Sequence, residues 1–110
     1  MRLLIFAALL FMKPASALEL IRLHPGFITK LRCDGKLLIS SVGNEAIVLL
    51  SALPKELGCG VFLRPISASG KTNLFLETSS GTISRLIEID SGGRSPNAGE
   101  LEYRLKGDAQ

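Results

Sequence analysis

Turn-forming residues recur every few positions along this chain and leave room only for short stretches of regular structure. Pro25-Gly26, Asp34-Gly35 and Ser80-Gly81 are examples, and the intervals between such turns are rich in Ile, Leu, Val and Phe. Runs of roughly four to eight such residues between turns are typical of β-strands, whereas ordinary helices need about ten or more. The chain is therefore predicted to be all-β.

Alternation of polar and apolar side chains supports this prediction. In Ile28-Thr29-Lys30-Leu31-Arg32 polar residues interrupt apolar ones at close to period two, as in a strand with one buried face. We predict strands over residues 19–23, 27–33, 36–41, 46–50, 61–64, 73–78, 82–89 and 100–105. Residues 51–58 can hold one short helical turn, because Pro54 suits the first turn of a helix. About seven to eight short strands without a long amphipathic helix favour a small antiparallel β-sandwich or a partly open barrel.

Two turns carry hairpin signals. Asp34-Gly35 lies between two strand-like runs, and this dipeptide is typical of the tight primed turns that join paired antiparallel strands. We therefore expect the strands on either side of it to pair with each other. Ser79-Ser80-Gly81 predicts a second hairpin, between residues 73–78 and 82–89.

The segment 1–17 is predicted to be a secretory signal peptide. Arg2 supplies the positive start, residues 3–12 are almost wholly apolar, and Ala15-Ser16-Ala17 is the pattern that signal peptidase cleaves. The alternative is a membrane-spanning helix, but about ten apolar residues reach only half of the roughly 20 that a bilayer requires. We expect an exported domain, periplasmic or outer-membrane-associated, with no integral membrane span after signal cleavage and no lipid anchor at position 18.

Removal of this segment also changes the charge. Arg2 and Lys13 leave with it, so 13 basic residues fall to 11 against 10 acidic ones. The remaining charges are scattered singly, which does not favour binding of nucleic acid. The mature length suits one small domain over residues 18–90, followed by a tail over residues 91–110.

The predicted export bears on the state of the two cysteines. Cys33 and Cys59 are the only pair, and in an oxidising compartment they can form one intramolecular disulfide. On the chain-entropy model, such a bridge contributes roughly 3–4 kcal/mol to the free energy of unfolding. The alternative is two reduced thiols buried as small hydrophobes. Two cysteines and the distant His24 do not make a metal ligand set, so no metal is expected.

The tail departs from the pattern of the domain. Residues 91–99 have no large apolar side chain to bury, so they are predicted to form a flexible linker. The strand pattern of residues 100–105 then stands alone, and it can pair with its own domain or add to the sheet of a partner. The candidate partner-binding residues are Glu100, Leu101, Tyr103 and Leu105.

Motifs for catalysis and cofactor binding are weak. Gly70-Lys71-Thr72 ends like a phosphate-binding loop, but the required preceding glycine is replaced by Pro65 and the following residues read as a strand. His24 precedes Pro25 and has no evident catalytic partner, which is typical of a surface turn residue. We expect neither an enzyme nor a nucleotide or other cofactor.

One resemblance follows from an ordered series of motifs over residues 20–89. The series runs through His24-Pro25-Gly26, Gly43-Asn44, Leu63-Arg64-Pro65, Thr72-Asn73-Leu74 and Thr78-Ser79-Ser80-Gly81. It is similar to the N-terminal β-sandwich domain of the TraK-like outer-membrane core components of type IV secretion and conjugation systems. A related arrangement opens the secretin subunits of pilus assembly machines.

The resemblance implies a β-sandwich that works in an envelope assembly. In that family a linker normally leads to a second β-domain, which binds a lipoprotein partner and lines the outer-membrane pore. Here the sequence ends at Gln110, and Cys33 and Cys59 stand in segments that are normally free of cysteine. The resemblance thus implies a single-domain relative stapled by a disulfide.

Two functions are compatible with these observations. The first is a non-enzymatic exported assembly protein, whose partners are other subunits of a bacterial secretion or conjugation complex. The alternative is a free exported binding module, an inhibitor or effector that recognises one protein. Glycan recognition is disfavoured, because Tyr103 is the only tyrosine and tryptophan is absent. A secreted hydrolase lacks a plausible base.

Overall fold

The computed structural model describes residues 19–107. The predicted signal peptide and the last three residues of the tail lie outside this range. The strands are β1 (Leu20–Leu23), β2 (Thr29–Arg32), β3 (Leu37–Val42), β4 (Val48–Ala52), β5 (Gly60–Pro65), β6 (Gly70–Thr78), β7 (Gly81–Ile89) and β8 (Glu102–Arg104). Two short 3-10 helices, η1 (Lys55–Leu57) and η2 (Ala98–Glu100), complete the described elements.

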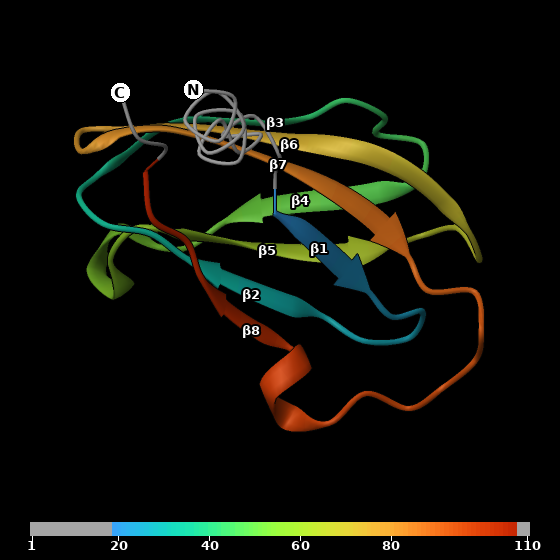
Figure 1. The fold of residues 1–110 in the computed structure, drawn as a ribbon. Coiled ribbons are helices and arrows are strands. Elements are labelled where there is room, and N and C mark those ends of the chain that lie inside the picture. Colours follow the sequence, from blue (N-terminus) through green and yellow to red (C-terminus); the bar gives the residue numbers. More distant parts are fainter. Residues whose placement is uncertain (1–18, 108–110) are drawn as a thin grey trace, which may run out of the picture.

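The strands form two separate sheets of four strands each. One sheet, called sheet A below, has the order β1-β7-β6-β3, and the other, sheet B, has the order β4-β5-β2-β8. The two sheets face each other as layers, with β8 reached at the end of a long connection from β7 (Figure 1). The all-β prediction is confirmed, and of its two architectures the structure has the sandwich. Residues 19–107 include no helix with the length and apolar character that crossing a membrane requires.

The sandwich is not wholly antiparallel. β1 pairs with β7 in parallel, and β8 pairs with β2 in parallel, whereas the other strand pairs are antiparallel. Parallel partners need a long connection between them. The sequence supplies it in both cases, since most of the domain separates β1 from β7 and β2 from β8. Both sheets are therefore mixed.

The hairpin predicted at Asp34-Gly35 is wrong. β2 pairs with β5 and β8, whereas β3 pairs with β6, so this turn carries the chain from one sheet to the other. Gly35 does have the positive φ, of 83°, that the dipeptide signals. Beyond it, the Lys36 N–H donates to Ser79 Oγ at 2.8 Å and the Ser79 N–H donates to the Lys36 carbonyl at 2.9 Å. These bonds direct β3 towards β6 and away from β2.

The second predicted hairpin is confirmed. β6 and β7 are the longest strands, with nine residues each, and they pair from Gly70–Ile89 to Thr78–Gly81. Thr78 Oγ1 donates to the Gly81 carbonyl at 2.9 Å and accepts from the Ser80 N–H at 3.0 Å. The side chain thereby satisfies the backbone of the turn, as threonine does at such positions.

β4 begins two residues later than the predicted strand 46–50. The Asn44 side chain accepts a hydrogen bond from the Ala46 N–H at 2.9 Å, and the Asn44 carbonyl accepts one from the Ile47 N–H at 3.3 Å. This local turn delays the start of the strand, and among residues 44–47 the Ile47 carbonyl already accepts a hydrogen bond from the Ile66 N–H at 2.8 Å. η1 lies inside the predicted helical interval 51–58, with Pro54 as its N-cap.

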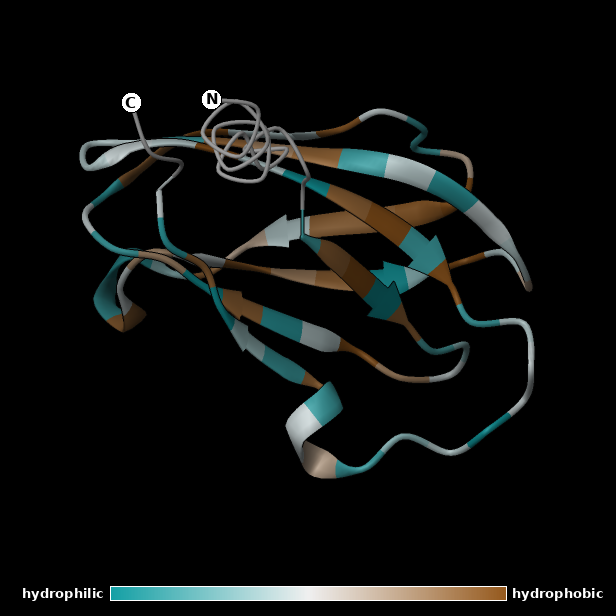
Figure 2. Ribbon diagram, viewed as in Figure 1, coloured by the Kyte–Doolittle hydropathy of each residue, from teal (hydrophilic) through white to brown (hydrophobic). Residues whose placement is uncertain are grey.

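The core lies between the two sheets and follows the period-two pattern. Along β7 the inward positions Ile83, Arg85, Ile87 and Ile89 are buried, and the positions between them are half-buried or exposed. Figure 2 shows this alternation of hydrophobic and hydrophilic residues along the strands. The hydrophobic core residues are Ile21, Leu23, Leu31, Cys33, Val42, Val48, Cys59, Val61, Leu63, Leu74, Leu76, Ile83, Ile87, Ile89 and Leu105. Thus one continuous core joins both sheets and the tail.

Candidate functional site

Each sheet ends in two edge strands, and these edges are the main candidate contact surfaces. β1 and β3 flank sheet A, and β4 and β8 flank sheet B. An edge strand carries a row of N–H and C=O groups without a strand partner, which another chain can complete. Four such edges exist among residues 19–107, and they differ in length, charge and surroundings.

The tail strand β8 pairs within its own domain, which is one of the two alternatives that the sequence leaves open. The Leu101 carbonyl accepts from the Lys30 N–H at 2.9 Å, and the Leu105 N–H donates to the Arg32 carbonyl at 2.7 Å. Leu105 is 1% exposed and belongs to the core. These bonds occupy one side of β8 and leave only its outer side for a partner.

The four candidate residues of the tail have different surroundings. Tyr103 is half-buried and packs against the core, Leu101 is half-buried, and Leu105 is enclosed. Glu100 ends η2, where its carboxylate binds Arg94. Tyr103 and Leu105 therefore attach the tail to the core, and partner binding at the four residues stays a prediction.

The outer edge of β8 is short and charged. The strand has three residues, and its outward side chains are Glu102 and Arg104. Arg104 donates to Asp34 at 2.8 Å, and Arg32 Nε lies 3.9 Å from Glu102. Short, charged edge strands are a common protection against unwanted strand pairing. The β8 edge is thus less open to a partner strand than its position suggests.

Arg85 fixes the tail from sheet A. It occupies an inward position of β7, is 7% exposed, and donates to the Lys106 carbonyl at 2.9 Å and the Ser84 carbonyl at 2.7 Å. Its Nε lies 3.3 Å from the Glu19 carboxylate. One buried guanidinium therefore joins the start of the described chain to the end of the tail.

Replacing Arg85 with Met should loosen the tail while the sandwich remains folded. Met keeps much of the apolar stem, but it removes the hydrogen bond to the Lys106 carbonyl. We expect amide hydrogen exchange at Leu105 to accelerate by at least about tenfold relative to Ile83, because local opening then costs less. The matched control is Arg22→Met, which removes an exposed ion pair with Glu88 and should leave exchange at Leu105 unchanged. Equal exchange in both variants would contradict this role of Arg85.

The connection to β8 contains a second charged contact. Arg94 donates to both oxygens of Glu100, at 3.1 and 2.6 Å, and the Asn97 N–H donates to Glu100 Oε1 at 2.9 Å. The Asn97 and Glu100 side chains form a reciprocal capping box on η2. The hydrogen bond from Arg94, followed by the one from Asn97, lowers the pKa of Glu100 from 4.5 to about 2. Flexibility of residues 91–99 stays a prediction.

The pKa of Glu100 gives a pH prediction. The pKa of Glu100 is lower in the folded state than in the unfolded chain. This contact therefore stabilises the fold fully above pH about 4.5, and the stabilisation is lost as the pH falls through about 2. Replacing Arg94 with Gln should raise the pKa of Glu100 towards 4.5, since it removes the charged hydrogen-bond donor that lowers this pKa most. Carboxyl 13C NMR of Glu100 over pH 1.5–6 measures this, and an unchanged midpoint in the variant would refute the assigned cause.

His24 is buried, which corrects its prediction as a surface turn residue. It is 1% exposed, and its Nδ1 lies 3.6 Å from Asp90 Oδ2. The parallel pairing of β1 with β7 sets Leu23 beside Ile89 and so brings the next residues, His24 and Asp90, together. Because this pairing spans most of the chain, local turn chemistry around Pro25 does not reveal it. Neither imidazole nitrogen has a hydrogen-bond partner among residues 19–107.

Gly70-Lys71-Thr72 opens strand β6, so the helix that follows a phosphate-binding loop is replaced by a strand. The part of the chain that the structure describes holds no group of three metal-capable side chains.

A cleft opens at the end of the sandwich where β3 begins and β4 ends; we call it the mouth. It has a volume of about 400 Å³ and is lined by Gly35, Lys36, Leu37, Leu38, Ala52, Leu53, Lys55 and Gly58. Leu38 is 62% exposed, whereas Leu53 at the inner wall is 7% exposed. An exposed leucine beside a buried one makes this opening an apolar surface with contact to the core.

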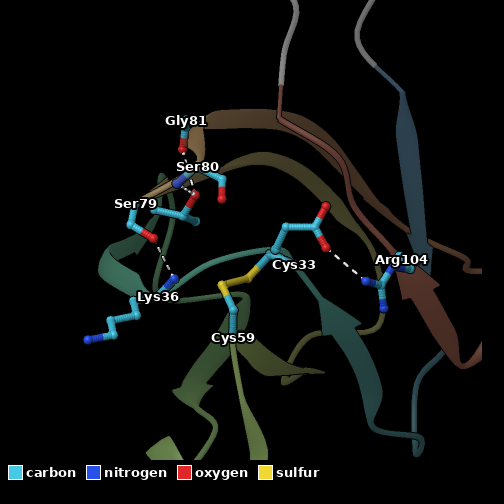
Figure 3. The surroundings of a disulfide bond; sticks show 9 residues. Cys33, Lys36, Cys59, Ser79, Ser80, Gly81 and Arg104 are labelled. Atoms are coloured by element: carbon cyan, nitrogen blue, oxygen red, sulfur yellow. Dashed lines mark hydrogen bonds and ion pairs between the residues drawn. A yellow bond between two sulfur atoms is a disulfide. The ribbon is translucent and has the colours of Figure 1, made fainter.

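The disulfide Cys33–Cys59 borders the mouth. It joins the end of β2 to the start of β5 with a Cα–Cα distance of 5.1 Å, and the Cys33 N–H also donates to the Cys59 carbonyl at 3.0 Å. Figure 3 shows the bridge between Lys36 on one side and Arg104 on the other. The predicted disulfide is thus confirmed, and it fixes the two segments that carry the walls of the mouth.

Sequence reasoning missed the mouth, although one signal was present. Leu37-Leu38-Ile39 is a run of three apolar residues that breaks the alternation of a half-buried strand. The structure has a register shift between Leu37 and Ile39, so Leu38 and Ile39 both become exposed. Such bulges re-aim side chains at sheet edges.

No protein-family model matches the chain, and a search among curated proteins finds no match.

Proposed function

We propose that the protein is a non-enzymatic exported assembly component, which contributes its β-sandwich to a bacterial envelope secretion or conjugation complex. The observation that carries the proposal is a stapled two-sheet sandwich with free edge strands, one pair of which flanks an exposed apolar mouth. Exposed strand edges next to apolar side chains are a common basis for recognition of another chain.

Two further points support the export and the partner class. A disulfide is typical of proteins in oxidising, exported compartments, and the signal-like segment 1–17 agrees with that location. The order of turn motifs over residues 20–89 resembles TraK-like domains, which work in such assemblies. The specific compartment, periplasmic or attached to the outer membrane, is part of the proposal.

Crosslinking in intact cells tests the proposal. Cells that express the chain with a tag after Gln110 are treated with a reversible crosslinker, and the envelope is then solubilised in mild detergent. We expect a large species that contains several different envelope proteins, identified by size separation and mass spectrometry. A single partner in a small complex would favour the alternative of a free binding module. A lone chain would overturn both functions.

A further inference from the structure

The mouth combines apolar walls with two lysines. Its only charged lining residues are Lys36 and Lys55. Lys36 immediately precedes β3, and Lys55 begins η1. Neither ammonium group has an ion-pair partner among residues 19–107, since the nearby Asp34 binds Arg104. The site therefore presents leucine side chains beneath a positive rim. Its volume of about 400 Å³ lies within the range of about 300–1,000 Å³ that is usual for ligand sites.

The backbone beside the mouth is free on one side. The Leu53 N–H donates to the Gly60 carbonyl, and the Ile66 N–H donates to the Ile47 carbonyl. Hydrogen bonding alternates along an antiparallel strand, so Leu50 and Ala52 direct their N–H and C=O groups away from β5. No described strand lies on that side, because β4 is the edge of sheet B.

The other edge at the mouth is less suitable for a partner strand. β3 shows a register shift between Leu37 and Ile39, next to the cleft, whereas β4 pairs with β5 without a break over Val48–Ala52. A bulge interrupts the regular spacing of free backbone groups and so discourages strand addition. β4 is therefore the edge on which an added strand fits.

We propose that an extended acidic segment of a partner protein, with leucine-like residues at alternate positions, adds to β4 and extends sheet B. Its inward apolar side chains enter the mouth against Leu38 and Leu53, and its carboxylates lie near Lys36 and Lys55. A lipid or fatty acid matches the walls and charge but leaves the free groups of Leu50 and Ala52 unused. This inference rests on the proposed function, because it names the chemistry of the partner.

The test uses NMR of the 15N-labelled chain without residues 1–17. The probe is an alternating glutamate–leucine heptapeptide, and the comparison ligands are an alternating lysine–leucine heptapeptide and decanoate. We expect the acidic peptide to shift the amide signals of Leu50 and Ala52, with saturation at millimolar concentration or below. The double variant Lys36→Glu/Lys55→Glu should weaken binding by about tenfold or more. The matched control Lys71→Glu, on the exposed face of β6, should not.

Each other outcome overturns the inference. No binding at millimolar peptide, equal binding of the basic peptide, or shifts confined to β3 or β8 would contradict it. Decanoate shifts without involvement of Leu50 and Ala52 amides, together with a silent acidic peptide, would assign the mouth to a lipid chain. Unchanged melting temperatures of the variants exclude unfolding as the cause. If the envelope complex forms in cells but the peptide does not bind, the proposed function stands and the partner binds elsewhere.

Discussion

Replacing Cys33 with Ser lowers the melting temperature of the oxidised protein by about 15–25 °C. The bridge spans 26 residues of sequence, and on the chain-entropy model its loss costs about 3.5 kcal/mol. For a domain of this size, each kcal/mol corresponds to roughly 4–8 °C. Thermal unfolding followed by circular dichroism, without reductant, measures the effect.

Two controls separate the bridge from the change of side chain. Dithiothreitol should lower the melting temperature of the unmodified chain by a similar amount, and it should not affect a double variant with Ser at positions 33 and 59. The same destabilisation is expected for Cys59→Ser. If neither reductant nor substitution changes the melting temperature, the disulfide has no stabilising effect and the account of the stapled sandwich is wrong.

Leu105→Ala should destabilise the domain by about 2–4 kcal/mol. The side chain is 1% exposed and belongs to the shared core, and removal of a buried leucine leaves a cavity as well as a loss of apolar burial. A residue on a free tail would cost less than about 0.5 kcal/mol. Urea unfolding gives the difference directly, since the midpoint shifts while the slope stays constant.

Leu57→Ala is the matched control for this prediction. Leu57 is 54% exposed at the end of η1, so the same change of side chain should have a small effect. A similar loss of stability in both variants would mean that the effect does not depend on burial of the leucine. No loss for Leu105→Ala would show that the tail leaves the core in solution.

Strand positions were predictable from the sequence because alternation is a local property. β7 illustrates this, since Ile83, Ile87 and Ile89 are separated by even numbers of residues and so lie on the same face of the strand. The same spacing places Arg85 on the inward face. Alternation does not show which polar groups make the burial of a guanidinium possible. One of these groups, the Lys106 carbonyl, belongs to a distant segment.

Strand pairing was harder to predict than strand position. The Asp34-Gly35 turn has the backbone conformation that its sequence signals, yet its neighbouring strands enter different sheets. The sheet to which a strand belongs depends on competition among all partners, and here Ser79 on the β6–β7 turn binds Lys36. For the same reason, the pairing of β8 with β2 was left open by the sequence.

The candidate site shows the same difference between local features, which the sequence indicates, and long-range contacts, which it does not. The sequence indicated the strand of the tail as a contact surface, and β8 is an edge strand of sheet B. It did not indicate the mouth, because Lys36 and Lys55 are far apart in the sequence and line one cleft only in the folded domain. Sites built from two sheets require the topology, which local patterns do not contain.

Site-specific photocrosslinking in cells tests whether the sandwich binds a partner through its strand edges. A photoreactive amino acid replaces Leu38 at the mouth, Glu102 on β8, or Leu86 on the outer face of β7, one at a time. We expect a discrete crosslinked product of defined mass from position 38 and none from position 86. A product from position 102 would report a second contact. Equal products at all three positions, or none at any, would contradict the claim that this sandwich binds a partner through its strand edges.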